Sequence, residues 1–424
     1  MAVADLPPRS GGSRRRVAVL SKKNLLTHRY DQWLGQEGFD VFLFADDTAA
    51  TRAFASSVPH RFAGVRLFGD WKRNRAVDAA VLAENESRPF AAVVALSECD
   101  VVRAAELRER MGLDGQQVAS ASAFRDKSVM KAIARGAGLD TPAYQCVNSV
   151  ADLMDFAAGH RATVVVKPLD GAGSADTVRL QGMDAIESWV AGKAFRCDEP
   201  GRYLVEEWID APMLAVDGIV AAGGIRTSMV GAFVGTCLQT ISALEPSGIL
   251  MLDHADPRGP AALDYTARLL KAIPCADRPM VFHCELFDIP GRGLALCEIA
   301  CRTGGGNTNL IAQQVLALDL ERAACLAQAG LPVDVPLASA RPGPIMGDML
   351  VPHPGRPLAA PVPPCPIPGV LSVTVNQEIA ASASRASKMS HYVIDALFEA
   401  DDHAGLQRVY AQFEDWLRHV LVWR

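Results

Sequence analysis

Residues 281–309 have the sequence VFHCELFDIPGRGLALCEIACRTGGGNTN, and the fold of the chain is decided there. The apolar segments Val281–Phe287 and Leu294–Ile299 flank the sequence IPGRG, whose proline and glycines supply turn conformations, so the stretch predicts a β-hairpin. Glu285 and Glu298 lie thirteen residues apart, one on each arm, and a pleated strand pair can point both side chains to the same face.

A carboxylate that faces inward among Val, Phe, Leu and Ile is unfavourable unless a cation neutralises it. Glu285 and Glu298 therefore indicate a divalent metal, and their oxygen ligands suit Mg²⁺, which keeps waters and shares its coordination shell with substrate phosphates. Arg302 and the loop Thr303–Gly306 follow, and the bare backbone of that loop lets a ligand approach closely. The alternative is an edge hairpin with two solvated glutamates and an ordinary glycine turn, and this motif alone does not decide between them.

The composition bounds the class of protein. A chain of 424 residues predicts two or three domains, and 50% hydrophobic with 21% charged residues is a soluble globular balance. The net charge of −6 gives no support for a nucleic-acid partner, and no run reaches the roughly eighteen apolar residues of a membrane span. Residues 1–16, rich in Pro, Gly, Ser and Arg, lack an apolar signal region and predict a disordered tail, so we expect a cytoplasmic location.

The ten cysteines form no CxxC pair, which is typical of reduced, buried thiols in a cytosolic protein. Cys297 and Cys301 bracket Glu298, but no second ligand pair accompanies them, so structural zinc is not indicated.

Residues 17–120 predict a doubly wound parallel α/β domain. Short apolar runs at Val17–Leu20, Val41–Phe44 and Ala91–Leu96 alternate with segments of helical length, the first of which contains Trp33. The first run is not followed by GxGxxG, so a dinucleotide site, and with it a nicotinamide-dependent oxidoreductase, is not supported.

Three lysines follow in two segments. Ser122–Ala137 predicts one helix with Lys127 and Lys131 four residues apart, a spacing that alone indicates a solvent-facing stripe. The strand Ala162–Pro168 ends in Lys167, and the loop 169–177 after it is rich in free backbone N–H groups. A point charge beside such a nest of amides is how proteins hold a polyphosphate, although an ordinary glycine turn is the alternative and the order of a Walker loop is absent.

The region 200–300 predicts a mainly antiparallel sheet, and helices follow it. The expected strands are Tyr203–Ile209 (YLVEEWI), Val216–Val220 and Met229–Val234, with turns at Asp217-Gly218 and Gly223-Gly224. The expected helices are Leu310–Leu318, Asp319–Gln328 and, after a proline-rich boundary at 332–368, the amphipathic Leu406–Val420, whose apolar stripe indicates core packing.

The order of these features resembles the ATP-grasp superfamily, and within it the carboxylate-amine ligases that join amino acids into dipeptides. Lys127 comes first, then Lys167 with its glycine loop, EEWI, and finally Glu285 with Glu298-x-x-x-Arg302. The resemblance covers residues 91–310, and the segments around the two glutamates with the triple glycine look especially like the ligase branch.

The resemblance implies roles for particular residues, with ATP and Mg²⁺, for which Mn²⁺ can substitute, as cofactors. Lys167 and Arg302 match catalytic positions, Arg302 beside the acyl phosphate. The implied nucleotide-binding residues are Lys127, Lys167, Gly171, Gly173, Ser174, Glu206, Glu207, Trp208 and Ile209, the metal ligands are Glu285 and Glu298, and the expected substrate contacts are His254, His283, Gly305, Gly306 and Asn307.

The resemblance also implies an architecture and partners. The expected parts are an N-terminal α/β domain (17–120), an ATP-grasp domain (121–335) with a lid at about 141–208 and a central antiparallel sheet, and a C-terminal α/β domain (336–424). The expected partners are a small-molecule carboxylate and an amine, amino acids foremost, with a homodimer as the expected assembly.

Two positions depart from the family pattern. Many members have a further metal-binding Asn where this chain has Ala300, and a ribose-binding glutamate where it has Met213. Rival interpretations are a carboxylase-type or purine-pathway ATP-grasp ligase and an ATP-binding regulatory protein without turnover.

Overall fold

The computed structural model describes residues 14–160, 163–192, 202–222, 224–274, 278–335, 343–387 and 391–424. The chain divides into two compact units: Met1–Gly115 with Cys325–Pro332 forms unit 1, and Gln116–Ala324 with Val333–Arg424 forms unit 2. The finer division of unit 2 into an ATP-grasp and a C-terminal domain stays a prediction.

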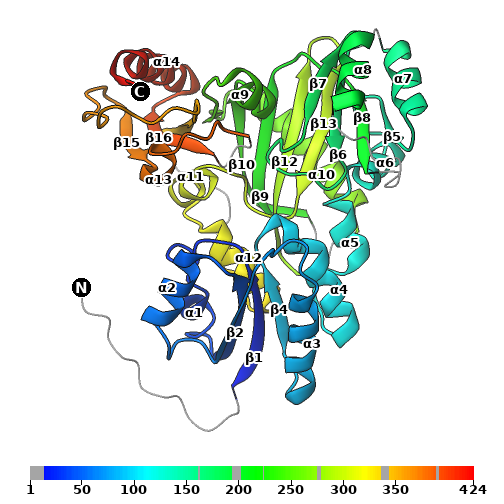
Figure 1. Cartoon of the computed structure of the whole chain (residues 1–424), viewed down its shortest axis with the longest axis vertical. Coiled ribbons are helices and arrows are strands. Elements are labelled where there is room, and N and C mark those ends of the chain that lie inside the picture. The colour runs from blue at the N-terminus through cyan, green and yellow to red at the C-terminus, as the bar shows by residue number, and fades with distance from the viewer. Residues whose placement is uncertain are drawn as a thin grey trace. The chain divides into compact units, whose positions relative to one another are not determined.

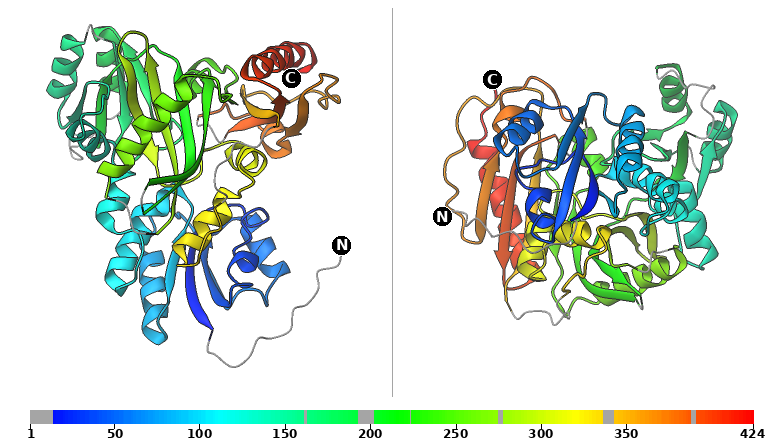
Figure 2. Two further views of the ribbon diagram at one scale, coloured as in Figure 1. Left: turned by 180° about the vertical axis from the view of Figure 1, so that it is seen from behind. Right: turned by 90° about the horizontal axis from the view of Figure 1, so that it is seen from below.

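Unit 1 contains a parallel four-stranded sheet in the order β3-β2-β1-β4, with α1 and α2 on one side and α3 and α4 on the other (Figures 1 and 2). β1 and β4 are buried on both faces, as strands of a parallel sheet covered by helices are. The elements are β1 (Arg15–Ser21), α1 (Tyr30–Trp33), β2 (Phe39–Asp46), α2 (Ala49–Ser57), β3 (Gly64–Phe68), α3 (Ala76–Ser87), β4 (Ala92–Ala95), a 3₁₀ turn (Glu98–Asp100) and α4 (Val101–Met111).

The doubly wound fold predicted for this region is confirmed, with three differences in detail. β1 begins at Arg15, so the expectation of a tail up to residue 16 is wrong at its end, and residues 1–13 lie outside the described residues. The helix expected around Trp33 is a single turn. β3 was missed because it is an edge strand whose half-exposed sequence, GVRLF, lacks the fully apolar pattern of its neighbours.

Unit 2 begins with two helices, α5 (Val118–Ala123) and α6 (Lys127–Gly136), where one helix was predicted. The break is at Asp126, whose side chain accepts hydrogen bonds from the backbone N–H groups of Ser128 and Val129 and so starts α6 as its N-cap. Because this cap fixes where α6 starts, it also fixes where Lys127 lies, at the first position of the helix.

An antiparallel four-stranded sheet follows, in the order β5-β8-β6-β7, and we call it the lid sheet. Two helices lie on one face of this sheet (Figure 2). Their side chains Leu153, Phe156 and Ile186 belong to one buried cluster with strand side chains such as Val164 and Val205. The elements are β5 (Tyr144–Val147), α7 (Val150–Gly159), β6 (Thr163–Pro168), β7 (Val178–Gln181), α8 (Met183–Gly192) and β8 (Tyr203–Glu207).

The central sheet of unit 2 has eight antiparallel strands in the order β13-β12-β9-β10-β11-β14-β16-β15. The last three strands come from the C-terminal segment, so that segment extends the central sheet. The strands are β9 (Met213–Ala221), β10 (Gly224–Val234), β11 (Gly248–Met251), β12 (Met280–Ile289), β13 (Gly293–Ala300), β14 (Ile345–Pro352), β15 (Val370–Val375) and β16 (Tyr392–Ala400). The helices are α9 (Cys237–Ala243), α10 (Arg258–Ala272), α11 (Thr308–Val315), α12 (Leu320–Gln328), α13 (Gln377–Ala380) and α14 (His403–Val420). Of these, α12 passes from unit 2 into unit 1 at Cys325.

The turn predicted at Asp217-Gly218 is wrong, because β9 continues straight through both residues. A Cβ at Gly218 would lie 2.3 Å from the backbone oxygen of Thr227 on β10, so the glycine allows close strand contact. The apolar stripe predicted for the C-terminal helix is confirmed as core, since Tyr410 and Phe413 of α14 are buried in the cluster that β14 and β16 form. Among the described residues, no helix is long and apolar enough to cross a membrane.

Candidate active site

The hairpin of β12 and β13 brings the two predicted metal ligands together. The strands pair antiparallel with Glu285 directly opposite Glu298, so both carboxylates project from the same face of the central sheet. The register then shifts, with Leu286 opposite Leu296, which makes Cys297 the extra residue of a β-bulge beside the site. The predicted hairpin is confirmed.

Glu298 is surrounded by cations. Nζ of Lys127, at the start of α6, lies 3.2 Å from Oε2 of Glu298. Burial alone would raise the pKa of Glu298, but the charges of Lys127, Lys167 and Arg302 outweigh it and lower this pKa to about 2. The glutamate is therefore an anion at every physiological pH, and three positive side chains lie near it.

Glu285 is held by a relay of side chains from two neighbouring strands. Nε2 of His283 lies 3.1 Å from Oε1 of Glu285, and Nδ1 of the same ring lies 2.9 Å from Oδ1 of Asp217 on β9. Burial would lower the pKa of His283, but the two carboxylates outweigh it and raise this pKa to about 10. His283, an expected substrate contact, thus orients Glu285 in this structure.

The glycine loop docks on this relay. The backbone N–H of Gly304 donates to Oδ1 of Asp217, with N and O 3.1 Å apart. A Cβ at Gly304 would lie 2.8 Å from Nδ1 of His283 and 2.9 Å from Oδ1 of Asp217, whereas a Cβ at Gly305 would meet no atom within 4 Å. Packing against the relay therefore explains Gly304, whereas a side chain at Gly305 would meet open space.

This difference predicts the effects of two matched substitutions. Gly304→Ala should lower the free energy of unfolding by about 1–3 kcal/mol, because the new methyl group forces the loop away from Asp217 and His283. Gly305→Ala should leave that free energy within about 0.5 kcal/mol of the wild-type value. Urea unfolding followed by circular dichroism measures both, and equal losses of stability in the two variants would contradict this packing.

Three buried ionisable side chains lie beside the carboxylates. Glu206 on β8 places Oε2 2.7 Å from Nζ of Lys167 and Oε1 3.1 Å from Nζ of Lys131. Burial would lower the pKa of Lys167, but Glu206 and Glu298 raise it above its ordinary value; for the fully buried Lys131, burial dominates and lowers the pKa. The solvent-facing stripe predicted for Lys127 and Lys131 is wrong, because both lysines are buried.

The loop after β6 is tied to the start of α6. Nζ of Lys127 donates to the carbonyl oxygen of Gly171 at 2.8 Å, and the side chain of Arg125 donates to the carbonyl of Asp170. Gly173 and Ser174 have φ angles of 60° and 56°, a left-handed conformation that turns the loop sharply. The expected phosphate-binding loop and Lys127 are thus neighbours.

The side chains of residues 206–209, the segment expected to bind adenine, point in different directions. Alternation along β8 buries Glu206 with the two lysines, while Oε1 of Glu207 accepts hydrogen bonds from Ala143 N–H and from Arg292 in the hairpin turn. Trp208 follows β8, and the guanidinium of Arg179 lies 4.4 Å from the centre of its ring. Ile209 is half-buried.

The remaining candidates lie at different places. Asn307, at the start of α11, donates its backbone N–H to Oδ2 of Asp348 on β14, and a Cβ at Gly306 would lie 3.1 Å from that same oxygen. Arg302 donates from Nη1 to the carbonyl oxygen of Thr303 at 2.8 Å. His254 is exposed in the turn after β11, and it takes no part in the hydrogen bonds and ion pairs that hold Glu285 and Glu298.

The carboxylate pair fits Mg²⁺. Among the described residues, no group of three or more His, Cys, Asp or Glu side chains is arranged as a complete metal cage. Two opposed glutamates are nevertheless what Mg²⁺ uses when substrate phosphates and water complete its octahedral shell. Ala300, one of the two positions that depart from the resembled family pattern, is buried opposite His283 and supplies no ligand.

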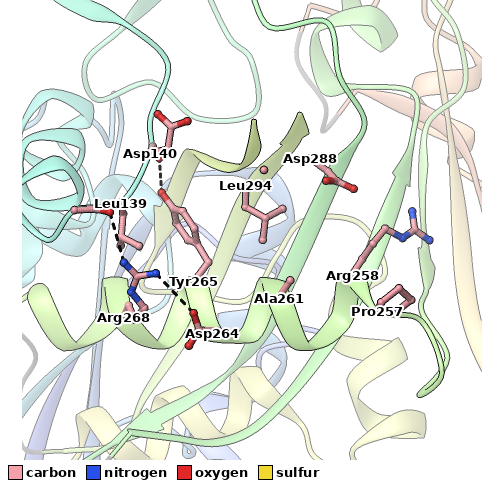
Figure 3. A pocket seen from close by; sticks show the side chains of 12 residues that line it. Leu139, Asp140, Pro257, Arg258, Ala261, Asp264, Tyr265, Arg268, Asp288 and Leu294 are labelled. Carbon is pink, nitrogen blue, oxygen red and sulfur yellow. Dashed lines mark hydrogen bonds and ion pairs between the residues drawn. The ribbon is translucent and has the colours of Figure 1, made fainter. Parts of the chain in front are cut away.

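A separate hollow of about 560 Å³ lies along α10 (Figure 3). It is lined by Tyr265 and Arg268 of α10, by Asp140, and by Asp288 and Leu294 of the hairpin. α10 packs on the sheet face that carries Phe282 and Cys284, and alternation along β12 directs Glu285 to the other face. The hollow is therefore not part of the carboxylate site.

The architecture has clear counterparts among solved structures. No protein-family model matches the sequence, and no curated protein matches it. An L-amino acid ligase from Bacillus licheniformis superposes with a TM-score of 0.71 at 18% identity, covering 97% of this chain and 99% of that one. The chain has the ATP-grasp fold.

Two further ATP-grasp structures resemble it. Carboxyaminoimidazole ribonucleotide synthase from Aspergillus clavatus, solved with ATP, gives a TM-score of 0.67 at 16% identity over 96% of this chain and 99% of that chain. Phosphoribosylglycinamide synthetase from Anaerococcus prevotii gives 0.64 at 10% identity over 97% and 100%. At these identities the likeness establishes the ATP-grasp fold, and the activity must be argued from the site.

Three residues of this site were missed in the sequence. Lys131 shares a buried face of α6 with Lys127, Met130 and Ala134, and this i, i+3, i+4, i+7 spacing was the available signal. Asp217 lies in an apolar run, and its pairing with Gly218 in the sequence was interpreted as a turn. Asp348 on β14 has no local sequence signal, because its partners are Ile249 N–H and Asn307 N–H from distant segments.

Proposed function

We propose that the protein is an ATP-dependent carboxylate-amine ligase that forms an amide bond through an acyl phosphate, releasing ADP and phosphate. The observation that carries this proposal is the opposed pair Glu285 and Glu298 with Lys127, Lys167 and Arg302 near it. An anionic metal-binding pair ringed by cations suits a triphosphate and a carboxylate, which repel one another unless their charges are balanced.

In the first step, an oxygen of the substrate carboxylate attacks the γ-phosphorus of ATP, the bond to the bridging oxygen breaks, and ADP leaves. Glu285 and Glu298 would hold Mg²⁺, which supplies charge neutralisation to the phosphates. Lys127 and Lys167 offset the remaining negative charge. Lys127 also donates a hydrogen bond to the carbonyl oxygen of Gly171 and so holds that loop beside the start of α6. His283 keeps Glu285 in position throughout.

In the second step, an amine attacks the carbonyl carbon of the acyl phosphate, the bond to the phosphate oxygen breaks, and the departing phosphate takes up the proton that the nitrogen loses. The guanidinium of Arg302, fixed beside the glycine loop by Thr303, stabilises the negative charge of the tetrahedral intermediate. The lid sheet and its loop would keep water from hydrolysing the acyl phosphate before the amine arrives.

The proposed substrates are amino acids. The fold likeness to an L-amino acid ligase over nearly the whole length of both chains supports this choice. The second candidate is a purine-pathway ligase, which the likeness to carboxyaminoimidazole ribonucleotide synthase favours. Mg²⁺, a homodimer and a cytoplasmic location belong to the same proposal.

The test is a screen of acid and amine pairs for ADP release with ATP and Mg²⁺. We expect release to require an amino acid as acid, to stop when EDTA removes the metal, and to resume with Mg²⁺ or Mn²⁺. Hydroxylamine in place of the amine should trap the acyl phosphate as a hydroxamate. ADP release only with aminoimidazole ribonucleotide and bicarbonate would support the purine-pathway candidate, and nucleotide binding without release under any pair would support a regulatory protein.

A further inference from the structure

Lys131 lies beside the proposed nucleotide site, and its side chain does not reach the surface. Its side chain is completely buried, and Nζ lies 3.1 Å from Oε1 of Glu206, whose other oxygen lies 2.7 Å from Nζ of Lys167. Nζ of Lys131 also donates to the backbone carbonyl of Leu296 at 2.9 Å. Lys131 therefore joins three segments: α6, the lid strand β8 and the bulged edge strand β13.

The charge of this cluster depends on Lys131. Lys131, Glu206 and Lys167 carry two positive charges and one negative charge, so the cluster is a net monocation. Without the ammonium of Lys131, Glu206 and Lys167 would neutralise each other, and the cluster would present no net charge to a phosphate. Glu206 would also be free to draw Lys167 toward itself with both oxygens.

Stability alone does not account for a lysine here. Burying an ammonium group carries a large desolvation penalty, and replacing buried charged groups with apolar side chains of similar volume is often neutral or stabilising. A methionine would extend the packing of Met130 and Ala134, which lie on the same buried face of α6. The charge of Lys131 therefore calls for a role in the site.

We propose that Lys131 is a positioning residue: it balances the charge of Glu206 and so leaves the positive charge of Lys167 available to the nucleotide phosphates. This inference rests on the proposed function, because it needs a nucleotide in the site. Lys131 itself is too deeply buried to touch the nucleotide, so it acts through its neighbours.

The experiment measures ADP and adenosine binding by calorimetry, in the presence of Mg²⁺, for the full-length wild type, K131M, K131Q and the double variants K131M/E206Q and K131Q/E206Q. K131M should weaken ADP binding by about tenfold or more while adenosine affinity changes little, because only ADP carries phosphates. K131Q should do the same, since its amide can still donate to Leu296 but carries no charge. Each double variant should recover to within about threefold of wild type, because removing Glu206's charge restores the net monocation.

The outcomes separate the two proposals. A wild-type protein that binds no nucleotide would overturn the proposed function itself. A wild type that binds ADP, with K131Q binding equally well or with the double variants no better than the single ones, would overturn the role of Lys131. K131Q that fails to fold would also overturn it, since Lys131 would then be a structural requirement. K271Q, on an exposed lysine of α10, is the matched control and should bind ADP like wild type.

Discussion

Replacing Glu298 with Gln should reduce ADP release by about 10²–10³-fold or more while the protein remains folded. The substitution keeps the shape of the side chain but removes the negative charge that faces Lys127 at 3.2 Å and that would bind the metal beside Glu285. The amide oxygen can still accept a hydrogen bond from Lys127, so the fold should lose little. Steady-state ADP release and a thermal melt measure the two quantities.

The control is Glu414→Gln on α14. It removes one carboxylate from an exposed pair with Arg418, and exposed pairs contribute roughly 0–1 kcal/mol to stability, so its activity and melting temperature should match wild type. Ordinary activity in folded Glu298→Gln would mean that the opposed glutamates do not bind the metal. The same substitution at Glu285 provides a second test, because both residues belong to one site.

The sequence predicted the part of the site that local pattern determines. The two apolar arms around IPGRG determine a hairpin, so the sequence could place Glu285 and Glu298 on neighbouring strands, whereas the bulge at Cys297 that sets them directly opposite was not predicted. Lys167 at the end of a buried strand and the glycines after it were likewise local signals. In both cases, residues close together in the chain determine the local structure.

The errors arose where distant segments determine the structure. Asp217-Gly218 has the composition of a turn, but β9 passes through it because β10 and β12 pair with it on both sides. Lys131 shares a buried face of α6 with Met130 and Ala134, so its burial has a local signal, but Glu206 from the lid sheet and Leu296 from β13, which contact its ammonium group, lie far away in the chain. The roles of both residues depend on contacts more than sixty residues away in the chain, which no local pattern encodes.

Arg302→Ala should reduce amide formation by about 10²–10³-fold while ADP affinity stays within about threefold of wild type. All three cations lie near Glu298, but they have different further partners. Lys127 also holds the loop at Gly171 and Lys167 pairs with Glu206, whereas Arg302 follows β13 and is anchored to Thr303 beside the glycine loop. Loss of the guanidinium should therefore slow attack by the amine more than it weakens nucleotide binding. Rates of amide product at saturating ATP, with calorimetric ADP titration, measure the two.

Arg302→Lys sharpens this test, because lysine keeps the charge but lacks the planar fork that fits a tetrahedral oxyanion. We expect it to recover only part of the lost rate, and to form hydroxamate from hydroxylamine faster than Arg302→Ala does. Arg418→Ala, which removes an exposed guanidinium on α14, should behave like wild type and controls for the loss of one positive charge. If Arg302→Ala lost ADP affinity in proportion to its rate, Arg302 would belong with the lysines that bind the nucleotide, and stabilisation of the second step would have to come from the glycine loop.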